Sequence, residues 1–344
     1  MTAAPDPFIS ILLPVLNEEN YVAGALACLI PQTSGVGCEI LVIDGGSTDL
    51  TARIVELISS ANNHIKLVHN EKRLQSAAIN LGAKIADARS RYLLRVDCHA
   101  HYPPNFIACC VKAMPAHDAA SVVVPMQTVG VTCFQKAVAS VQNSTIGNGG
   151  AAHRRNGGSG FVDHGHHAMF NRDIFLSLGG YDETFSHNED AEYDLRLAKA
   201  GYKIWMDGEA AITYFPRASF FALAAQYFNY GSGRAGTFLK HNAPLKARQI
   251  FPFAALLSCL LAAAASPFVP WALIVPSAYF LGCMSAGLGL AIRETSLCVA
   301  LFGGIAAMTM HMAWAVGFLW RIVRTDKRIP PAEQLEKAVL APPS

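Results

Sequence analysis

The chain has 344 residues, with 27 Lys and Arg against 25 Asp and Glu, a near-neutral balance that offers no basic surface for nucleic acid. A chain of this length buries one large core or two modest ones. The charges are unevenly distributed, because residues 249–292 and 296–320 carry none. Each run exceeds the roughly 20 apolar residues that cross a bilayer. Two such runs in tandem disfavour a buried core helix and predict a membrane protein with a soluble N-terminal domain.

Strands and helices alternate through most of that N-terminal domain. Apolar runs predict strands at residues 8–15, 39–43, 65–69, 91–96, 121–125 and 202–205. Helices are predicted from Asn17, placed as an N-cap, and over residues 50–59, 76–88 and 188–201. The alternation predicts an α/β fold around a parallel sheet, in which ligands bind outside the carboxyl ends of the strands.

The first seven residues lack the basic start and apolar core of a signal peptide. We therefore expect the soluble domain to stay in the cytoplasm. The nine cysteines show no C-x-x-C spacing, and they predict reduced, mostly buried thiols rather than a disulfide framework or a zinc site.

Asp97 and His99 follow the strand predicted at residues 91–96. Two residues apart in an extended chain, they share one side, where a carboxylate and an imidazole could hold a divalent cation. Such a cation would stabilise the phosphates of a nucleotide as they leave. The alternative is a solvated aspartate beside a packed histidine, and the motif alone leaves both open.

Asp44 and Asp49 flank a glycine turn after the second predicted strand. The glycines allow the backbone to approach a ligand, and a carboxylate can accept hydrogen bonds from a base or a ribose. Ser47 and Thr48 are equally suited to cap the following helix. Because the turn is neither a G-x-G-x-x-G nor a Walker motif, it disfavours dehydrogenases and P-loop enzymes.

Glu189 and Asp190 stand in the first turn of a predicted helix. The helix dipole favours ionised carboxylates there, so Asp190 could act as a general base, or both residues could merely complement the dipole. Nearby, His164, His166 and His167 lack the partner ligands of a metal site, and we interpret them as acceptor contacts or ordinary loop histidines.

In this order, the motifs resemble those of the family 2 glycosyltransferases of the GT-A fold. The resemblance covers about residues 8–245. Segments 14–18, 44–49, 97–99 and 189–190 resemble, in turn, the family's opening motif, nucleotide turn, D-x-D motif and ED base motif. His99 stands where the family usually has Asp.

The resemblance implies an inverting, metal-dependent enzyme. It would move a sugar, expected to be glucose from UDP-glucose, to a lipid-linked saccharide in exopolysaccharide synthesis. Asp190 would take the proton of the acceptor hydroxyl. Mg²⁺ or Mn²⁺ at Asp97 and His99 would offset phosphate charge, together with Arg234. The expected partners are the membrane and other polysaccharide-assembly enzymes, and not nucleic acid.

The resemblance also implies the residues that bind substrate. Asp44 and Arg73 are expected at uracil, and Asp97 at the ribose. The other residues expected to bind substrate are Pro14, Asn17, Glu18, Glu189 and Arg234. Segment 226–234 occupies the place of the Q-x-x-R-W motif of processive members, which is only partly kept, and this argues against a polymerising synthase.

Two functions other than sugar transfer are disfavoured by the sequence. A membrane scaffold that binds a nucleotide sugar without turnover is disfavoured by the presence of both Asp97 and Asp190. A nucleotidyltransferase would carry a glycine-rich, basic signature near the N-terminus, which residues 14–21 lack.

We expect a GT-A domain over residues 1–245, a transmembrane helical region over 246–325 and a tail over 326–344. Residues 218–230 are expected as an interfacial helix. Hydropathy counts three crossings, near residues 250–270, 271–292 and 297–320.

An odd number of crossings conflicts with the charges that flank the apolar runs. Lys246 and Arg248 favour a cytoplasmic entry, and three crossings would then place Arg321 and Arg324 outside. The prolines of the first run could break it into a partial insertion. We therefore expect a multi-pass inner-membrane protein with two full crossings, one partial insertion and both termini in the cytoplasm.

Overall fold

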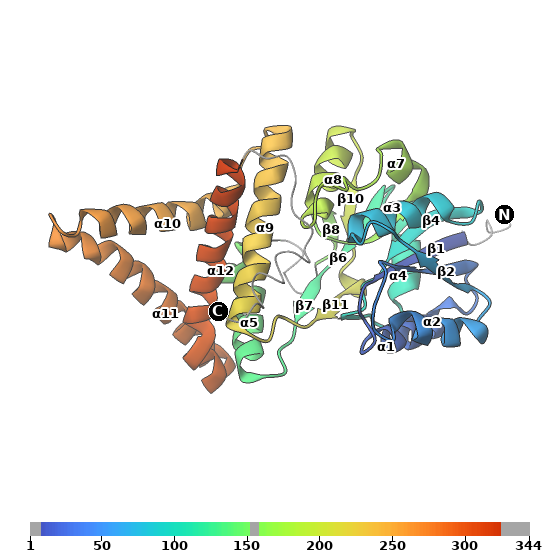
Figure 1. Cartoon of the computed structure of the whole chain (residues 1–344), viewed down its shortest axis with the longest axis horizontal. Coiled ribbons are helices and arrows are strands. Elements are labelled where there is room, and N and C mark those ends of the chain that lie inside the picture. The colour runs from blue at the N-terminus through green and yellow to red at the C-terminus, as the bar shows by residue number, and fades with distance from the viewer. Residues whose placement is uncertain (1–7, 152–157, 325–344) are drawn as a thin grey trace. The chain divides into compact units, whose positions relative to one another are not determined.

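The computed structural model describes residues 8–151 and 158–324, which form two compact units (Figure 1). The first unit contains the chain up to Gln127 and a later segment that ends at Tyr214. The second contains the segment that begins at Thr128 and the chain from Phe215 onward. The expected tail, residues 326–344, lies outside the described residues.

An eight-stranded sheet forms the centre of the first unit, in the order β3-β2-β1-β4-β9-β6-β10-β8. Its strands are β1 (Phe8–Val15), β2 (Cys38–Asp44), β3 (Ile65–His69), β4 (Ser90–Arg95), β6 (Ser121–Val124), β8 (Gly160–Val162), β9 (His166–Asn171) and β10 (Ile204–Met206). The predicted parallel pairing holds between β1 and its neighbours β2 and β4. However, β9 is antiparallel to β4 and β6, and β8 is antiparallel to β10. The sheet is therefore mixed, because helix–strand alternation predicts direction only where a crossover helix joins two strands.

A small sheet and several helices complete the first unit. The small sheet has the order β5-β11-β7, with β5 (Ala100–His101), β7 (Met126–Thr128) and β11 (Ile212–Tyr214). The helices are α1 (Val22–Leu29), η1 (Ile30–Thr33), α2 (Thr51–Ser60), α3 (Gln75–Ile85), α4 (Phe106–Ala116), α7 (Arg172–Ser177), α8 (Glu189–Lys199) and η3 (Gly208–Ala210).

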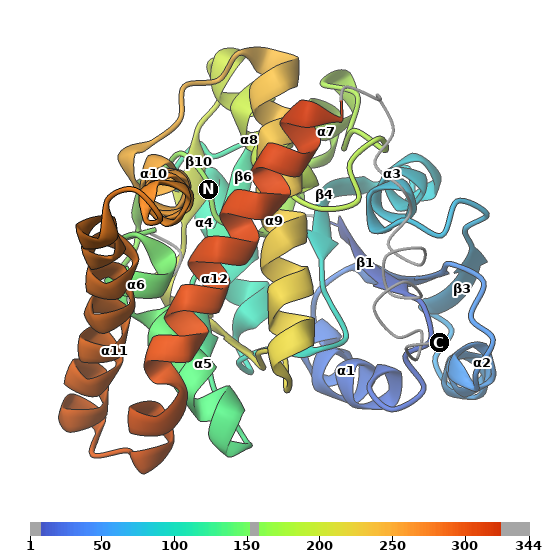
Figure 2. The ribbon, with the colours of Figure 1, turned by 60° about the vertical axis from the view of Figure 1, so that its left-hand side comes forward.

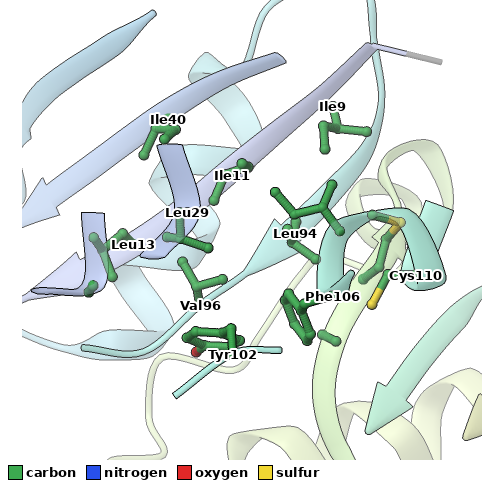
Figure 3. Close-up of a cluster of buried hydrophobic side chains, with 14 of the residues drawn as sticks. Ile9, Ile11, Leu13, Leu29, Ile40, Leu94, Val96, Tyr102, Phe106 and Cys110 are labelled. Atoms are coloured by element: carbon green, nitrogen blue, oxygen red, sulfur yellow. The ribbon is translucent and has the colours of Figure 1, made fainter. Parts of the chain in front are cut away.

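Both faces of the large sheet are covered, which explains why β1 is apolar at every position except Ser10. On one face, alternate residues of β1 pack with Phe106 and Cys110 of α4 (Figure 3). On the other face α3 lies so close that a Cβ on Gly82 would come within 2.7 Å of side-chain atoms of Leu12 and Ile43. The packed layers hold the carboxyl ends of β1, β2 and β4 at one edge.

The second unit is helical. Its helices are α5 (Cys133–Asn143), α6 (Thr145–Asn148), α9 (Phe220–His241), α10 (Ala247–Ala265), η4 (Pro270–Leu273), α11 (Ile274–Glu294) and α12 (Leu297–Val323). Within the part of the chain that the structure describes, three helical segments are long and apolar enough to cross a membrane: Ala247–Ala265, Pro270–Glu294 and Leu297–Val323. The three predicted apolar spans are thus helices.

Helix α12 is the central helix of the second unit. It packs along α9 and also contacts α5, α10 and α11 (Figure 2). Small residues allow the close approach, because a Cβ on Gly231 of α9 or on Gly317 of α12 would overlap a backbone carbonyl oxygen of the facing helix. The segment expected as an interfacial helix therefore belongs to a longer helix packed against α12.

Helices α10 and α11 form a hairpin whose turn projects away from α9 and α12 (Figure 1). The first apolar run is not broken, since α10 is continuous through Pro252. Pro267 and Pro270 fall in the turn, and Pro276 stands in the first turn of α11, where no intrahelical N–H bond is lost.

One expectation about the cysteines is wrong. Cys133 at the start of α5 and Cys298 near the start of α12 form a disulfide, with Cα atoms 5.0 Å apart. The pair is 165 residues apart in sequence, so spacing could not reveal it. The seven other cysteines are free thiols, as predicted.

Candidate active site

The loops after β1 and β2 interlock at the carboxyl edge of the sheet. The Asn17 N–H donates to Ser47 Oγ over 2.9 Å, and the Thr48 N–H donates to Asn17 Oδ1 over 2.8 Å. Asn17 has a left-handed backbone (φ 56°), so it turns the chain and does not begin a helix. The prediction of a helix from Asn17 is therefore wrong, and α1 begins at Val22.

Asp44 is the last residue of β2, and its carboxylate closes the turn that follows. Asp44 Oδ1 accepts from the Ser47 hydroxyl over 2.5 Å and from the Ser47 N–H over 3.0 Å. Helix α2 begins later, at Thr51, whose N–H donates to Asp49. Ser47 and Thr48 therefore tie the two loops together and do not cap α2.

Arg73 lies against the same turn. The Asn70 N–H, just before it, donates to the carbonyl oxygen of Asp44 over 2.7 Å. A Cβ on Gly45 would lie 3.4 Å from the Arg73 Cα atom, and Arg73 itself has a left-handed backbone (φ 53°). The fold thus brings together Asp44 and Arg73, two residues expected at one base. Pro14 pairs with Ile43 inside the sheet.

Asp97 is partly buried two residues beyond the end of β4. Its Oδ1 accepts from Gln75 Nε2 over 2.8 Å and from Arg95 Nε over 3.4 Å, while Oδ2 lies 3.8 Å from His166 Nε2. Burial alone would raise the pKa of Asp97, but the positive charge of Arg95 and the hydrogen bond from its guanidinium outweigh burial and lower that pKa. Asp97 is therefore held as a carboxylate.

His99 points to a different partner. Its Nε2 lies 3.0 Å from Glu18 Oε1, and its exposed ring packs edge-on against Tyr21. Among the described residues, no group of three or more His, Cys, Asp or Glu side chains is arranged to hold a metal ion.

His166 is the imidazole that faces Asp97. Burial and Arg95 lower the pKa of His166 to about 4, so its ring is neutral. The sequence alone does not predict His166 as a metal ligand.

Arg95 is the site residue that the sequence predictions missed. This buried guanidinium lies 3.4 Å from Asp97 Oδ1, through Nε, and 3.4 Å from Glu189 Oε1, through Nη1. It thereby links the segment after β4 to the first turn of α8. A charged residue among the apolar residues 92–96 was the available signal, since a buried Arg requires acidic partners.

Glu189 and Asp190 have contrasting environments despite being neighbours. Glu189 is buried, and burial raises its pKa to about 7; Arg95 opposes this shift and Asp190 adds to it. Asp190 is half-buried, and its Oδ1 accepts from the Ala191 N–H over 2.7 Å. Within the described residues, no hydrogen bond to Asp190 Oδ2 is found.

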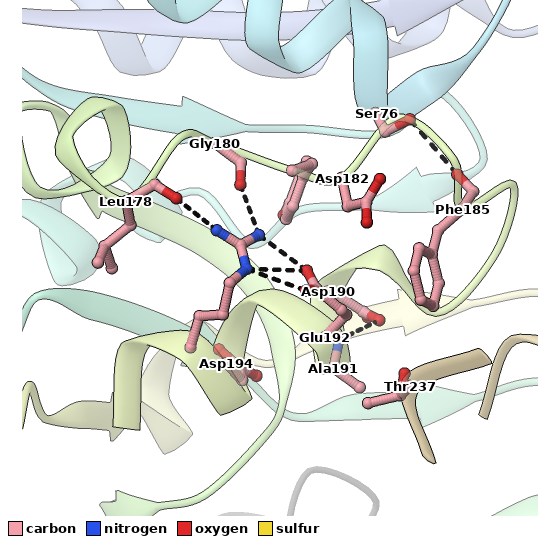
Figure 4. A network of polar contacts seen from close by, with 12 residues as sticks. Ser76, Leu178, Gly180, Asp182, Phe185, Asp190, Ala191, Glu192, Asp194 and Thr237 are labelled. Carbon is pink, nitrogen blue, oxygen red and sulfur yellow. Dashed lines mark hydrogen bonds and ion pairs between the residues drawn. The ribbon is translucent and has the colours of Figure 1, made fainter. Parts of the chain in front are cut away.

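Arg196 anchors helix α8 to the loop that precedes it. It pairs with Glu192 over 2.8 Å and donates to the carbonyl oxygens of Leu178 and Gly180, over 2.5 and 2.6 Å (Figure 4). These bonds fix the first turn of α8, which carries Asp190. Arg234, by contrast, lies in the second unit on α9, where its Nη2 is 3.5 Å from Gln249 Oε1.

Comparison with known proteins agrees with this architecture. The family described as Glycosyl transferase family 2 matches residues 10–179. The succinoglycan biosynthesis protein ExoA of Rhizobium meliloti is 41% identical over 312 residues, which are 90% of this chain and 93% of that protein. The chain is a family 2 glycosyltransferase. The predicted family and enzyme class are thereby confirmed.

Solved structures confirm the GT-A fold of this glycosyltransferase. The mannosyltransferase PcManGT from Pyrobaculum calidifontis, in complex with GDP-Man and Mn²⁺, aligns with a TM-score of 0.58 at 19% identity over 93% of this chain and 90% of that one. GalNAc-T7 with UDP, GalNAc and Mn²⁺ aligns with a TM-score of 0.50 at 15% identity over 69% and 55% of the two chains.

Proposed function

We propose that this glycosyltransferase moves glucose from UDP-glucose, with inversion, to a lipid-linked saccharide in the assembly of a succinoglycan-type exopolysaccharide. The name and the 41% identity of ExoA support the pathway. The chemistry is supported above all by one arrangement: Arg95 lies between Asp97 and Glu189, and the half-exposed Asp190 follows in the same helical turn.

In this proposal Asp190 is the general base. It stands in the first turn of α8, and its Oδ2 is available to an acceptor hydroxyl. Asp190 takes the hydroxyl proton while the acceptor oxygen bonds to the anomeric carbon of the sugar. The bond from that carbon to the diphosphate oxygen breaks on the opposite face, and UDP leaves with the bonding electrons.

The same proposal assigns the residues that bind the UDP-sugar. Asp44 and Arg73, which flank one turn, contact uracil, and Asp97 contacts the ribose. Pro14 lies near the end of β1, and the loop that follows, with Asn17 and Glu18, borders this turn because Asn17 is bonded to it. We assign Arg234 to the phosphates of the donor. Since UDP carries negative charge, a guanidinium is suited to that role.

Asp97 and His166 are suited to supply two of the ligands of a divalent cation. Asp97 offers a hard oxygen, and the neutral His166 ring faces it from 3.8 Å. We therefore add His166 to Asp97 and His99 as proposed ligands. When bound, Mg²⁺ or Mn²⁺ would stabilise the charge that develops on the leaving diphosphate. Arg95 and Gln75 meanwhile orient the Asp97 carboxylate.

We further propose that the hairpin of α10 and α11 makes the two membrane crossings. In each of its two apolar segments 17% of the most apolar stretch is buried, against 44% for α12, which α9 and α5 cover. This assigns the partial insertion to α12, because α10 is unbroken. Lys246, Arg248, Arg293 and Arg324 then all lie on the cytoplasmic side, as the positive-inside rule favours.

A donor screen tests the transfer proposal. Membranes that contain the full chain are supplied with UDP-glucose, other UDP-sugars or GDP-mannose, and lipid-extractable sugar and released nucleotide are measured. Transfer from UDP-glucose, with a β-linkage in the product, is expected. Binding of UDP-sugars without UDP release would instead support the scaffold alternative.

Metal removal tests the cation proposal separately. EDTA should abolish transfer, and added Mn²⁺ or Mg²⁺ should restore it. Asp97→Ala should weaken donor binding and the response to metal, whereas His99→Asp should keep activity with a shifted metal preference, because a harder ligand replaces imidazole. An unchanged rate in EDTA would show that the metal proposal is wrong.

A further inference from the structure

A line of buried hydrogen bonds extends from Arg95 into the protein. Arg95 Nη1 lies 3.2 Å from the Tyr181 hydroxyl, which lies 2.5 Å from His167 Nδ1. His167 Nε2 lies 2.7 Å from Asp194 Oδ1, and His164 Nδ1 lies 2.7 Å from Asp194 Oδ2. The first four side chains are buried, while that of His164 is 24% exposed. Neither the proposed transfer mechanism nor the family motifs use this line beyond Arg95.

Hydrogen-bond chemistry gives the line one direction. A guanidinium can only donate, so the Tyr181 oxygen accepts from Arg95 and donates its own proton to His167 Nδ1. When His167 accepts this proton on Nδ1, it carries its own proton on Nε2 and donates it to the carboxylate of Asp194. Each buried group in the line thus has a hydrogen-bond partner.

The ring of Tyr181 is also held by packing. It is parallel to the ring of His167, with centroids 5.7 Å apart, and it meets Phe170, Phe175 and Tyr193 edge-on. Because this aromatic cluster is buried, the Tyr181 hydroxyl has little freedom to move. It is a fixed acceptor for one arm of Arg95.

We propose that Tyr181, His167 and Asp194 are positioning residues, which set the Arg95 guanidinium where it bonds both Asp97 and Glu189. Arg95 in turn sets the distance between the donor side of the site and the turn that carries the base. This inference rests on the proposed function, because it assigns these residues a role in transfer. They touch neither substrate nor the reacting atoms.

The chain offers a matched pair of variants. Tyr181→Phe removes the hydroxyl that Arg95 and His167 share. Tyr193→Phe removes a buried hydroxyl from the same aromatic cluster, and that hydroxyl has no hydrogen-bond partner among the described residues. Both variants keep the ring, so only the first should disturb Arg95.

The readout is steady-state transfer from UDP-glucose in membranes, corrected for folded protein by size-exclusion of the detergent-solubilised chain. We expect Tyr181→Phe to lower kcat and raise the donor KM, with a combined loss in kcat/KM of about 10- to 100-fold. Tyr193→Phe should stay near wild type. Loss of folded protein alone would lower the maximal rate without changing KM.

A double variant tests whether Tyr181 acts through Arg95. Arg95→Lys keeps the charge but loses the fork that spans two carboxylates. If Tyr181 acts through Arg95, adding Tyr181→Phe to Arg95→Lys should cost less than about 3-fold more. Losses that multiply, or a wild-type kcat/KM for Tyr181→Phe, would overturn the inference. If wild type transfers no sugar from any donor, the proposed function has failed instead.

Discussion

Two carboxylates that are neighbours in sequence can have different surroundings, because each side chain is buried to its own extent. Glu189 and Asp190 are adjacent in one helical turn, yet one faces Arg95 inside the protein and the other is half-exposed. Burial raises the pKa of Glu189, so this group is poorly suited to remain an ionised base. The environments therefore favour Asp190 for proton removal and Glu189 for a structural bond to Arg95.

Asp190→Asn should abolish most transfer while donor binding persists. The side-chain volume is kept and the base is lost, which typically lowers kcat about 10²- to 10⁴-fold. Asp173 provides the control, since it also stands in the first turn of a helix after an Asn N-cap. Asp173→Asn should leave the rate unchanged. A rate for Asp190→Asn within a few-fold of wild type would remove Asp190 from the base role.

Glu39 predicts a pH dependence of stability away from the site. This buried carboxylate accepts from Ser10 Oγ (2.8 Å), Lys66 Nζ (2.9 Å) and the Asp87 N–H (2.6 Å). Burial alone would raise its pKa, but the bonds from Lys66 and Asp87 lower it below 4.5. The ionised group therefore stabilises the fold above about pH 4.5, and this contribution is lost as pH falls through the folded-state pKa.

Glu39→Gln should be less stable than wild type at neutral pH, by about 1–3 kcal/mol, because one buried bond network loses its charge. Its melting temperature should also fall less steeply than that of wild type below about pH 4.5. Melting curves of the solubilised chain across pH 3 to 7 measure both effects, with Glu56→Gln on the exposed face of α2 as the control. Parallel pH profiles for wild type and Glu39→Gln would contradict the assignment.

At the scale of elements, contact between helices depends on residues that lack a side chain. Gly231 and Gly317 let α9 and α12 approach until a backbone carbonyl of each helix lies where the other's Cβ would be. Larger residues at these positions would hold the two helices farther apart, at the interaxial distance of about 8–10 Å that is usual for packed helices.

Gly231→Ala should therefore lower the melting temperature of the solubilised chain, because the added methyl overlaps the carbonyl oxygen of Trp314. Gly282→Ala in α11 is the matched control, since a Cβ there meets no atom within 4 Å. That variant should be neutral or slightly more stable, because Ala is favoured over Gly in helices by about 1 kcal/mol. Equal effects of the two changes would show that close helix contact does not decide stability.

At the scale of the whole molecule, the membrane segments differ in how much protein covers them. Helix α12 contacts α5, α9, α10 and α11, while the turn of the α10–α11 hairpin projects away from α9 and α12 (Figures 1 and 2). The apolar residues Phe268 and Trp271 in its turn are 88% and 79% exposed. Such a turn, free of charge, is compatible with lipid and the headgroup region.

A reporter fused after Ser344 should be active in the cytoplasm, because two crossings return the chain to its starting side. A periplasm-active reporter fused after Trp271, in the turn of the hairpin, should be active outside. Clear periplasmic activity after Ser344 would restore the model with three crossings. Cytoplasmic activity at both sites would leave the hairpin only partly inserted.

Local patterns in the sequence determined many of the strands and helices and the order of the motifs. The apolar run of β1, the charge-free segments after Arg248 and the carboxylates that open α8 each follow from residues close in sequence. For this reason strands, membrane-length helices and the segments around Asp97 and Asp190 were predictable.

Tertiary structure alone decided the partners of these residues. Asp97 joins Gln75 and Arg95, His99 turns to Glu18, and Cys133 meets Cys298 across 165 residues. The direction of β9 and the left-handed turn at Asn17 are likewise set by distant neighbours. Charge and periodicity report on the chain within a few turns, whereas a hydrogen bond or disulfide depends on where the fold brings remote segments.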